Sequence, residues 1–277
     1  MAIIPVAFKN AVVALGIDGS NREKHWIGSG FIVGRKEQSN PKLSTFYIIT
    51  NKHVVKNKSM LYIRFNSNGD VSVKDYKIGL NDKTNKKQFS GHPHPDVDIV
   101  AIQITPQTLI EDKSIWGAFD LDDHALTLEQ MQSTGVEEGS LVYALGFPLN
   151  LLDKVKTPVC RLGCISRISD AFILKQQQMP FLVDAQAFPG NSGGPIINRP
   201  ENLSIVGTPS NSKANLIGIL CAYLPYSDVL ISRQTGEVKM LQTENSGITV
   251  VYPVDRIRET VELEYDRANK MRLSVNR

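Results

Sequence analysis

The segment richest in potential chemistry is Phe188–Pro195, which reads Phe-Pro-Gly-Asn-Ser-Gly-Gly-Pro. Glycines surround Ser192, and glycine loses more conformational freedom on folding than any other residue, so this run is unfavourable in a regular strand. It suits a place where the backbone turns sharply. One chemical use is to direct the N–H groups of Gly190 and Ser192 at a single point beside the Ser192 hydroxyl, as an oxyanion hole. A glycine-rich hairpin turn without chemistry is an equally good interpretation of this segment alone.

The same segment matches G-x-S-x-G, the nucleophile elbow of α/β-hydrolases, in which the catalytic histidine follows the serine. The chain has five histidines, and all of them precede Ser192: His25, His53, His92, His94 and His124. Chain order therefore excludes the elbow, and a general base for Ser192 has to come from upstream.

His53 is the best-placed base. It follows Phe-Tyr-Ile-Ile-Thr-Asn-Lys, where an apolar strand ends in a short polar turn that carries the imidazole. A rigid strand of this kind holds a base at the edge of a cleft. A purely structural histidine is the alternative interpretation.

Asp98 is the candidate for the third group. It opens the apolar segment Asp-Ile-Val-Ala-Ile-Gln-Ile, where a carboxylate is costly to bury unless it accepts hydrogen bonds such as a histidine N–H supplies. Asp96, two residues earlier in the loop, is the second candidate for this role.

The loop before Asp98 reads Gly-His-Pro-His-Pro-Asp and resembles the H-x-H-x-D-H metal box of metallo-β-lactamase-like hydrolases. Val97 stands where that box needs its final ligand, and no histidine beyond His124 remains to complete a dinuclear site. The alternating prolines predict an extended loop with His92 and His94 exposed. We expect no metal and no other cofactor.

The elements that must position these groups are short strands. Apolar or alternating segments rich in β-branched residues recur between clusters of Gly, Asn, Asp, Ser and Pro, which is typical of an all-β sandwich or barrel. The long helices that a parallel α/β fold needs after its strands are missing. The predicted strands are Ala11–Leu15, Ile27–Val33, Phe46–Thr50, Leu61–Phe65, Ile99–Ile104, Leu141–Leu145, Val159–Ile165, Phe181–Val183, Leu216–Ala222 and Ile248–Tyr252.

Two polar stretches and one helix complete the predicted organisation. A stretch from Asp120 to Ser140 divides the strands into two groups, and we expect it to be a linker between two β-halves. A second stretch, from Asn66 to Ser90, predicts a surface hairpin or loop whose lysines form a solvated face, with a binding patch as the alternative. After Pro253, an apolar stripe at helical spacing predicts a terminal helix packed on a barrel. The stripe consists of Val254, Ile257, Val261 and Tyr265.

The order His53, Asp98, Ser192 resembles that of the chymotrypsin-like (trypsin-like, S1-type) serine peptidases, and especially their bacterial HtrA/Deg-like branch. Forty-five positions separate the first two residues and 94 the last two. The resemblance extends from about Ala11 to Tyr265, and its specificity comes from motifs that follow one another in order. These motifs are Trp26-Ile-Gly-Ser-Gly-Phe-Ile-Val33, Ile49-Thr-Asn-Lys-His53-Val-Val, Asp98-Ile-Val-Ala-Ile, Ala144-Leu-Gly-Phe-Pro148, Gly163-Cys-Ile-Ser166, Gly190-Asn-Ser-Gly-Gly-Pro195 and Tyr252-Pro-Val-Asp-Arg-Ile257.

The resemblance implies an all-β fold of two six-stranded antiparallel barrels with the site between them, followed by a C-terminal helix. The expected divisions are a first barrel at 1–120, a linker at 121–140, a second barrel at 141–253, and the helix and tail at 254–277. It also implies a serine endopeptidase: Ser192 is the nucleophile, His53 the general base and then acid, and Asp98 the group that orients the imidazole. The N–H groups of Gly190 and Ser192 form the oxyanion hole. A catalytically silent fold that only binds proteins is the alternative.

Several positions depart from the family pattern. HtrA proteins continue into a PDZ domain, whereas twelve residues follow Tyr265 here, so we expect none. Lys52 stands beside the base, and we expect its side chain to point to solvent. Cys221 takes the place of a serine that bonds the catalytic aspartate in many relatives. Asn191 is neutral, so it cannot pair with a new N-terminal amine as the corresponding aspartate does in secreted relatives.

The substrate pocket is predicted from the same alignment. Its base falls at Gln186, and its walls at Cys221 and Tyr223. A neutral amide does not offset the desolvation of a buried cation, and a large wall residue shortens the pocket. We therefore expect cleavage after small or medium apolar residues such as Ala, Val or Leu.

Composition limits the partners. The chain has 277 residues, 42% hydrophobic and 21% charged, with 31 Lys and Arg against 28 Asp and Glu, a formal net charge of +3. That surplus is too small to indicate nucleic acid or a membrane surface as the main partner. We expect a protein or peptide substrate, or one dedicated partner protein. Three cysteines without zinc-like spacing, and no recognisable signal peptide, predict a cytoplasmic protein.

Overall fold

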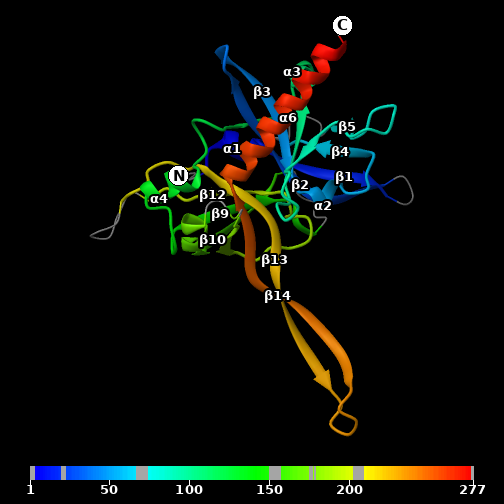
Figure 1. The fold of residues 1–277 in the computed structure, drawn as a ribbon, viewed down its shortest axis with the longest axis vertical. Coiled ribbons are helices and arrows are strands. Elements are labelled where there is room, and N and C mark those ends of the chain that lie inside the picture. Colours follow the sequence, from blue (N-terminus) through cyan, green and yellow to red (C-terminus); the bar gives the residue numbers. More distant parts are fainter. Residues whose placement is uncertain are drawn as a thin grey trace.

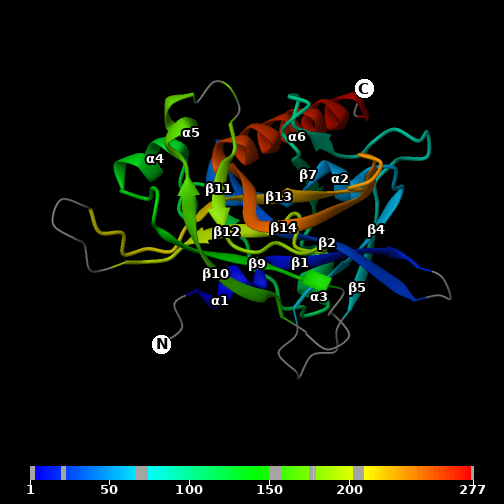
Figure 2. The same ribbon diagram turned by 90° about the horizontal axis from the view of Figure 1, so that it is seen from below.

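The computed structural model describes residues 4–19, 23–66, 74–149, 157–174, 177, 179–201 and 209–275. Its strands form two β units, and the long helix α6 (Val254–Val275) lies across both (Figures 1 and 2). The all-β class and the C-terminal helix are confirmed. No helix among the described residues is both long and apolar enough to cross a bilayer.

The first β unit is an eight-stranded sheet. Its hydrogen-bonded order is β5-β4-β1-β2-β3-β7-β6, and β8 pairs in parallel with β2. The strands are β1 (Val12–Asp18), β2 (Lys24–Glu37), β3 (Asn40–Thr50), β4 (Met60–Arg64), β5 (Asp75–Gly79), β6 (Ser90–Gly91), β7 (Val100–Ile104) and β8 (Phe119–Asp120).

This sheet curves but does not close, which differs from the expected closed barrel of six strands. Strand β6 has only two residues, so it offers little backbone to pair with β5. Helix α6 packs against β6 and β7 instead, and covering a sheet edge with a helix is a common way to protect unpaired strand groups.

The second β unit is a closed barrel of six strands in the order β10-β11-β14-β13-β12-β9, as expected. The strands are β9 (Leu141–Gly146), β10 (Val159–Arg167), β11 (Phe181–Asp184), β12 (Pro195–Asn198), β13 (Leu216–Ile231) and β14 (Val238–Pro253). The side chains that face its interior are apolar and buried, as the alternation in the sequence requires.

Strands β13 and β14 continue beyond this barrel as a long hairpin that projects from the body of the protein (Figure 1). The sequence predicts strands only up to Ala222 and from Ile248. Many of the added residues are large, apolar and exposed. They are Tyr223, Leu224, Tyr226, Val229, Leu230, Ile231, Val238, Met240 and Leu241.

The other helices are short, and only one of them is capped by the side chain of its own N-cap residue. They are α1 (Val6–Asn10), α2 (Lys52–Val55), α3 (Gln107–Glu111), α4 (Leu128–Ser133) and α5 (Ser169–Ile173). Helix α4 lies within the polar stretch that the sequence predicts as a linker. Thr127 and Gln130 form its capping box, which satisfies two backbone N–H groups at the start of the helix.

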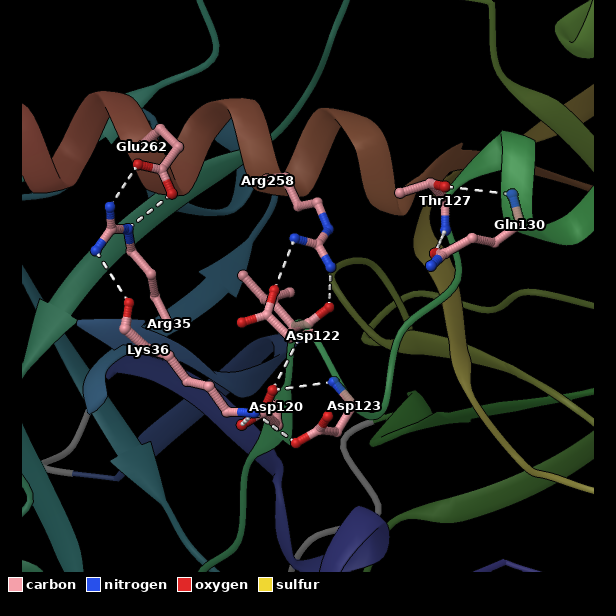
Figure 3. Close-up of polar contacts among 10 residues, drawn as sticks. Arg35, Lys36, Asp120, Asp122, Asp123, Thr127, Gln130, Arg258 and Glu262 are labelled. Atoms are coloured by element: carbon pink, nitrogen blue, oxygen red, sulfur yellow. Dashed lines mark hydrogen bonds and ion pairs between the residues drawn. The ribbon is translucent and has the colours of Figure 1, made fainter. Parts of the chain in front are cut away.

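Helix α6 joins the parts of the chain. Val254, Ile257 and Val261 are fully buried in a core cluster with residues of both β units. On its polar side, Glu262 holds the guanidinium of Arg35 in a bidentate pair at 2.7 and 2.8 Å, and Arg258 reaches Asp122 at 3.2 Å (Figure 3). The apolar stripe predicted for this helix therefore faces the core.

Candidate active site

The His53 imidazole lies against the Asp98 carboxylate. His53 stands in the single turn of α2, directly after β3, and Asp98 lies just before β7, which pairs with β3. The distance from His53 Nδ1 to Asp98 Oδ2 is 2.5 Å, and the His53 backbone N–H donates to Asp98 Oδ1 at 3.1 Å. Because Nδ1 faces the carboxylate, Nε2 is the ring nitrogen left for a substrate or a nucleophile.

Asp96 occupies a different position. Its side chain is 83% exposed and lies 3.9 Å from His94 Nδ1. Its backbone carbonyl accepts a hydrogen bond of 2.6 Å from the Tyr252 hydroxyl of β14. The second barrel therefore holds this loop in place through Tyr252. Of the two candidate acids, only Asp98 contacts His53.

The backbone N–H groups of the loop around Ser192 fall into two sets. Those of Asn191, Gly193 and Gly194 donate to carbonyl groups at 2.9 Å. Within the described part of the chain, the N–H groups of Gly190 and Ser192 have no such acceptor. They are the same pair that the glycine pattern predicts for an oxyanion hole.

Gly190 has to be glycine at this place. Its φ is +98°, which side chains rarely tolerate, and a Cβ atom would lie 2.4 Å from the carbonyl oxygen of Phe147. Gly193 is equally constrained, with φ at +86° and a Cβ position 2.1 Å from the Ser29 carbonyl oxygen. The glycines thus form a tight loop packed against the first β unit.

Ser29 holds the loop of Ser192 in place. The sequence did not mark Ser29 as a residue of the site. It is fully buried in β2, and its N–H donates to the Ser192 carbonyl at 2.8 Å. Its hydroxyl donates to the Gly190 carbonyl at 2.6 Å and accepts from the Phe147 N–H at 2.9 Å. The Thr50 hydroxyl donates to its carbonyl at 2.8 Å. The available sequence signal was a serine between two glycines in a predicted strand.

Gly28 lies in β2, between the helix that carries His53 and the loop that carries Ser192. A Cβ atom there would be 2.9 Å from Val54, the neighbour of His53, and 3.4 Å from the Ser192 carbonyl oxygen. The absence of a side chain lets the His53 helix and the Ser192 loop approach each other. In this structure the Ser192 hydroxyl and the His53 ring are not hydrogen-bonded, although both residues are described; such contacts are often long in unliganded enzymes.

Cys221 lies next to Asp98, but it does not contact the carboxylate as the family alignment predicts. Its thiol is 3.8 Å from the backbone carbonyl of Asp98, and the Asn51 side chain donates to both groups, at 2.9 and 2.7 Å. The thiol therefore supports the backbone of Asp98, not its carboxylate. Burial, and next the charge of Asp98, raise the pKa of the Cys221 thiol far above its usual range, so it stays protonated.

The expectation that Lys52 points to solvent is wrong. Its ammonium donates to the His94 carbonyl at 2.9 Å, which ties the helix of His53 to the loop of Asp98. Burial lowers the pKa of this ammonium, and the charges of Asp98 and Asp96 oppose that shift.

The predicted exposure of His92 is also wrong, because the loop folds back on α6. His92 is 4% exposed, and its Nε2 lies 2.7 Å from the Glu259 carboxylate. Its Nδ1 accepts the His94 N–H at 3.1 Å, so Nε2 carries the proton and donates it. His94 is partly exposed. Among the described residues, no three His, Cys, Asp or Glu side chains gather as metal ligands would.

The predicted pocket residues lie around β14. Gln186 is exposed, with its Cγ 3.9 Å from the Cβ position of Gly247 on β14. Tyr223 is 40% exposed and pairs across the ladder with Thr249, whose hydroxyl donates to the Ala185 carbonyl at 2.5 Å. β14 thus brings the segments of Gln186 and Tyr223 near each other, while Cys221 is buried.

Comparisons with known proteins agree with this arrangement. Residues 28–207 match the model of the trypsin-like peptidase domain. Two relatives, both named probable periplasmic serine endoprotease DegP-like, come from Halomonas elongata and Pseudomonas fulva. Each is 25% identical, over 66% and 67% of this chain, and the matches span 29% of either relative's length.

Among solved structures, the apo MamO protease domain from Magnetospirillum magneticum shares the fold. It superposes with a TM-score of 0.50 at 18% identity, covering 91% of this chain and 96% of that one. Because the family model matches well over half of its length, this chain belongs to the trypsin-like peptidase domain family.

Proposed function

We propose that this protein is an active serine endopeptidase whose catalytic groups are Ser192, His53 and Asp98. The observation that carries the proposal is the 2.5 Å contact between His53 Nδ1 and the Asp98 carboxylate, combined with the N–H groups of Gly190 and Ser192, which have no acceptor among the described residues. A protein that only binds its partners has no need of an oriented imidazole and a vacant pair of donors.

Each group has a role in the proposed reaction. The Ser192 hydroxyl attacks the carbonyl carbon of a peptide bond while His53 Nε2 takes its proton. Asp98 holds the ring in this tautomer and stabilises the imidazolium. The N–H groups of Gly190 and Ser192 bind the oxyanion, at about 3 to 4 kcal/mol per donor in measured enzymes. His53 then protonates the leaving amine. Water next attacks the acyl group while His53 takes its proton, and His53 returns this proton to Ser192 as the acid product leaves.

A fluorophosphonate probe tests the proposal, because only an activated serine reacts with it. We expect the full chain to be labelled at Ser192, and Ser192→Ala and His53→Ala to remain unlabelled. Asp98→Asn should label far more slowly, since the corresponding change costs roughly 10⁴-fold in a measured serine protease. The catalytically silent alternative predicts no labelling of a correctly folded protein.

Asp96→Asn is the matched control for the acid. It removes a carboxylate from the same loop without touching the His53 ring, so its labelling rate should stay near that of the parent. Loss of labelling in Asp96→Asn with retention in Asp98→Asn would reverse the assignment of the acid.

The cellular partners and location stay predictions. We propose a protein or peptide substrate and, given the small net charge, neither nucleic acid nor a membrane as the main partner. A cytoplasmic location is supported by three cysteines that are all unpaired, whereas the relatives' names place them in the periplasm. Fractionation of the native host, followed by antibody detection, distinguishes the two compartments.

A further inference from the structure

A groove of about 920 Å³ opens directly beside the proposed catalytic histidine. His53 and Asp98 line part of it. One stretch of its wall is the turn after α2, with Lys56 and Lys58. The segment between β5 and β6 contributes another, where the Lys87 ammonium lies 5.6 Å from the centre of the Phe89 ring. The sequence favours a solvated face for this segment, with a binding patch as the alternative.

The charged side chains that line the groove are mostly positive. Four lysines line it, Lys52, Lys56, Lys58 and Lys87, and Asp98 is its one carboxylate, already in contact with His53. None of these lysines lies within 4.0 Å of a carboxylate in the described part of the chain. Four other lysines of the described chain are paired with carboxylates: Lys24, Lys36, Lys74 and Lys239.

This concentration stands out because the whole chain carries only +3. A cleft lined by charges of one sign focuses the electrostatic potential and raises the local concentration of oppositely charged ligands. The ligand that complements the groove is therefore an anion. This anion must also be present at the groove when a substrate peptide is bound at His53.

We propose that this groove binds acidic side chains of the substrate, so that the enzyme prefers Asp or Glu within a few residues of the bond it cuts. The inference rests on the proposed function, in which His53 protonates the leaving amine of the substrate. Because His53 also lines the groove, a peptide bound for cleavage passes the mouth of the groove. Nucleic acid fits less well: apart from the His53 imidazole, the one aromatic ring in the lining is that of Phe89, which is 8% exposed and offers no face on which a base could stack.

The first test is a peptide library digested by the full chain and read by mass spectrometry, at low and at high salt. We expect Asp and Glu to be enriched near the cut bond at low salt, and the enrichment to fall as salt screens the lysines. The variant Lys56→Gln/Lys58→Gln/Lys87→Gln should lose it. The control Lys42→Gln/Lys213→Gln/Lys270→Gln removes the same charge at exposed positions outside the groove and should keep it.

A binding measurement makes the result independent of catalysis. The probe is a fluorescein-labelled peptide of alternating Ala and Glu, compared with alternating Ala and Gln, titrated against Ser192→Ala by anisotropy. We expect the acidic peptide to bind roughly tenfold more tightly than the neutral one, and the groove substitutions, not the control ones, to remove the difference. Fluorophosphonate labelling of the control variant should match the parent.

Equal binding of the two peptides overturns the inference, as does an equal loss in the control variant. Tighter binding of a single-stranded oligothymidylate, lost with the groove lysines, would assign the groove to nucleic acid instead. If the acidic peptide binds through these lysines while the full chain is never labelled, the groove stands and the proposed peptidase activity fails. The two failures are therefore distinguishable.

Discussion

At the scale of single residues, Ser29 links the first β unit to the loop of Ser192. Its fully buried hydroxyl donates to the Gly190 carbonyl and accepts a hydrogen bond from the Phe147 N–H. Ser29→Ala leaves both groups without their partner, at about 1 to 3 kcal/mol for each buried group. Because misplacement of catalytic groups by an ångström costs up to roughly a hundredfold in rate, we expect fluorophosphonate labelling to slow by more than the loss of folded protein explains.

Thr50→Val is the control for this substitution. It removes only the hydrogen bond to the Ser29 carbonyl and keeps the shape of the side chain. Thermal denaturation and labelling rates of the two variants are measured together. A labelling rate of Ser29→Ala equal to that of Thr50→Val at the same folded fraction would show that the hydroxyl does not position the loop.

Substrate preference is a second question at this scale. Gln186 carries no charge, and Tyr223 stands on the strand that leads away from Cys221. We expect cleavage after Ala, Val or Leu, and we expect Tyr223→Gly to extend the range toward larger residues by removing the wall. Peptide-library profiling of both proteins measures this. Dominant cleavage after Arg or Lys would mean that one of the two acids nearby in sequence, Asp184 or Asp228, reaches the pocket, or that Gln186 is not its base.

At the scale of elements, Glu138 caps helix α5. Its Oε1 atom accepts the N–H groups of Ile168 and Ser169, each at 2.7 Å, and the Ser169 hydroxyl at 2.8 Å. Burial alone would raise the pKa of Glu138, but these hydrogen bonds outweigh it and lower the pKa from 4.5 to about 2. A lowered pKa in the folded state means that the ionised cap stabilises the protein above about pH 4.5 and is lost as the pH falls toward 2.

The resulting prediction concerns Glu138→Gln. It should lower Tm at neutral pH, and its difference from the parent should shrink as the pH falls below about 4.5. Glu137→Gln removes the same charge next to the cap and should change Tm little at any pH. A pH-independent difference for Glu138→Gln would show that the ionised carboxylate is not what holds α5.

The β13–β14 hairpin gives a contrasting prediction. Val229 and Leu241 form a cross-strand pair in which both side chains are at least half exposed. Replacing both by Thr should therefore change stability by less than about 1 kcal/mol. Ile219→Ala, on the same strand but fully buried, should cost about 2 to 5 kcal/mol. A large loss for the exposed pair would mean that the hairpin is covered in solution.

The same hairpin shows what the sequence could and could not predict. Ala11–Leu15 and Leu216–Ala222 carry a strand pattern because burial forces apolar alternation, and both were predicted. Residues 223–247 lie outside the core, so no burial pattern marks them, and strand β6 is too short to carry one. The residues proposed for catalysis were predictable because their order is distinctive. Ser29 was not, since its partners are backbone groups distant in sequence.

At the scale of the whole molecule, α6 makes one core out of two β units. Ile257 is fully buried in a cluster that contains Phe31 of the first sheet and Leu216 of the second barrel. The polar side of the helix binds Arg35 of the first unit through Glu262 and His92 of the acid loop through Glu259. Neither β unit therefore keeps its buried surface when the other unfolds.

This shared core predicts one cooperative unfolding transition for the chain, although its length would allow two. Ile257→Ala removes a fully buried side chain from the cluster and should cost about 2 to 5 kcal/mol. Because both units pack on it, the whole calorimetric transition should move to lower temperature as a single peak. Leu263→Ala, on the same helix but 41% exposed, is the control and should move it little. Two resolved peaks, with only one shifted by Ile257→Ala, would show that the β units fold independently and that the helix belongs to one of them.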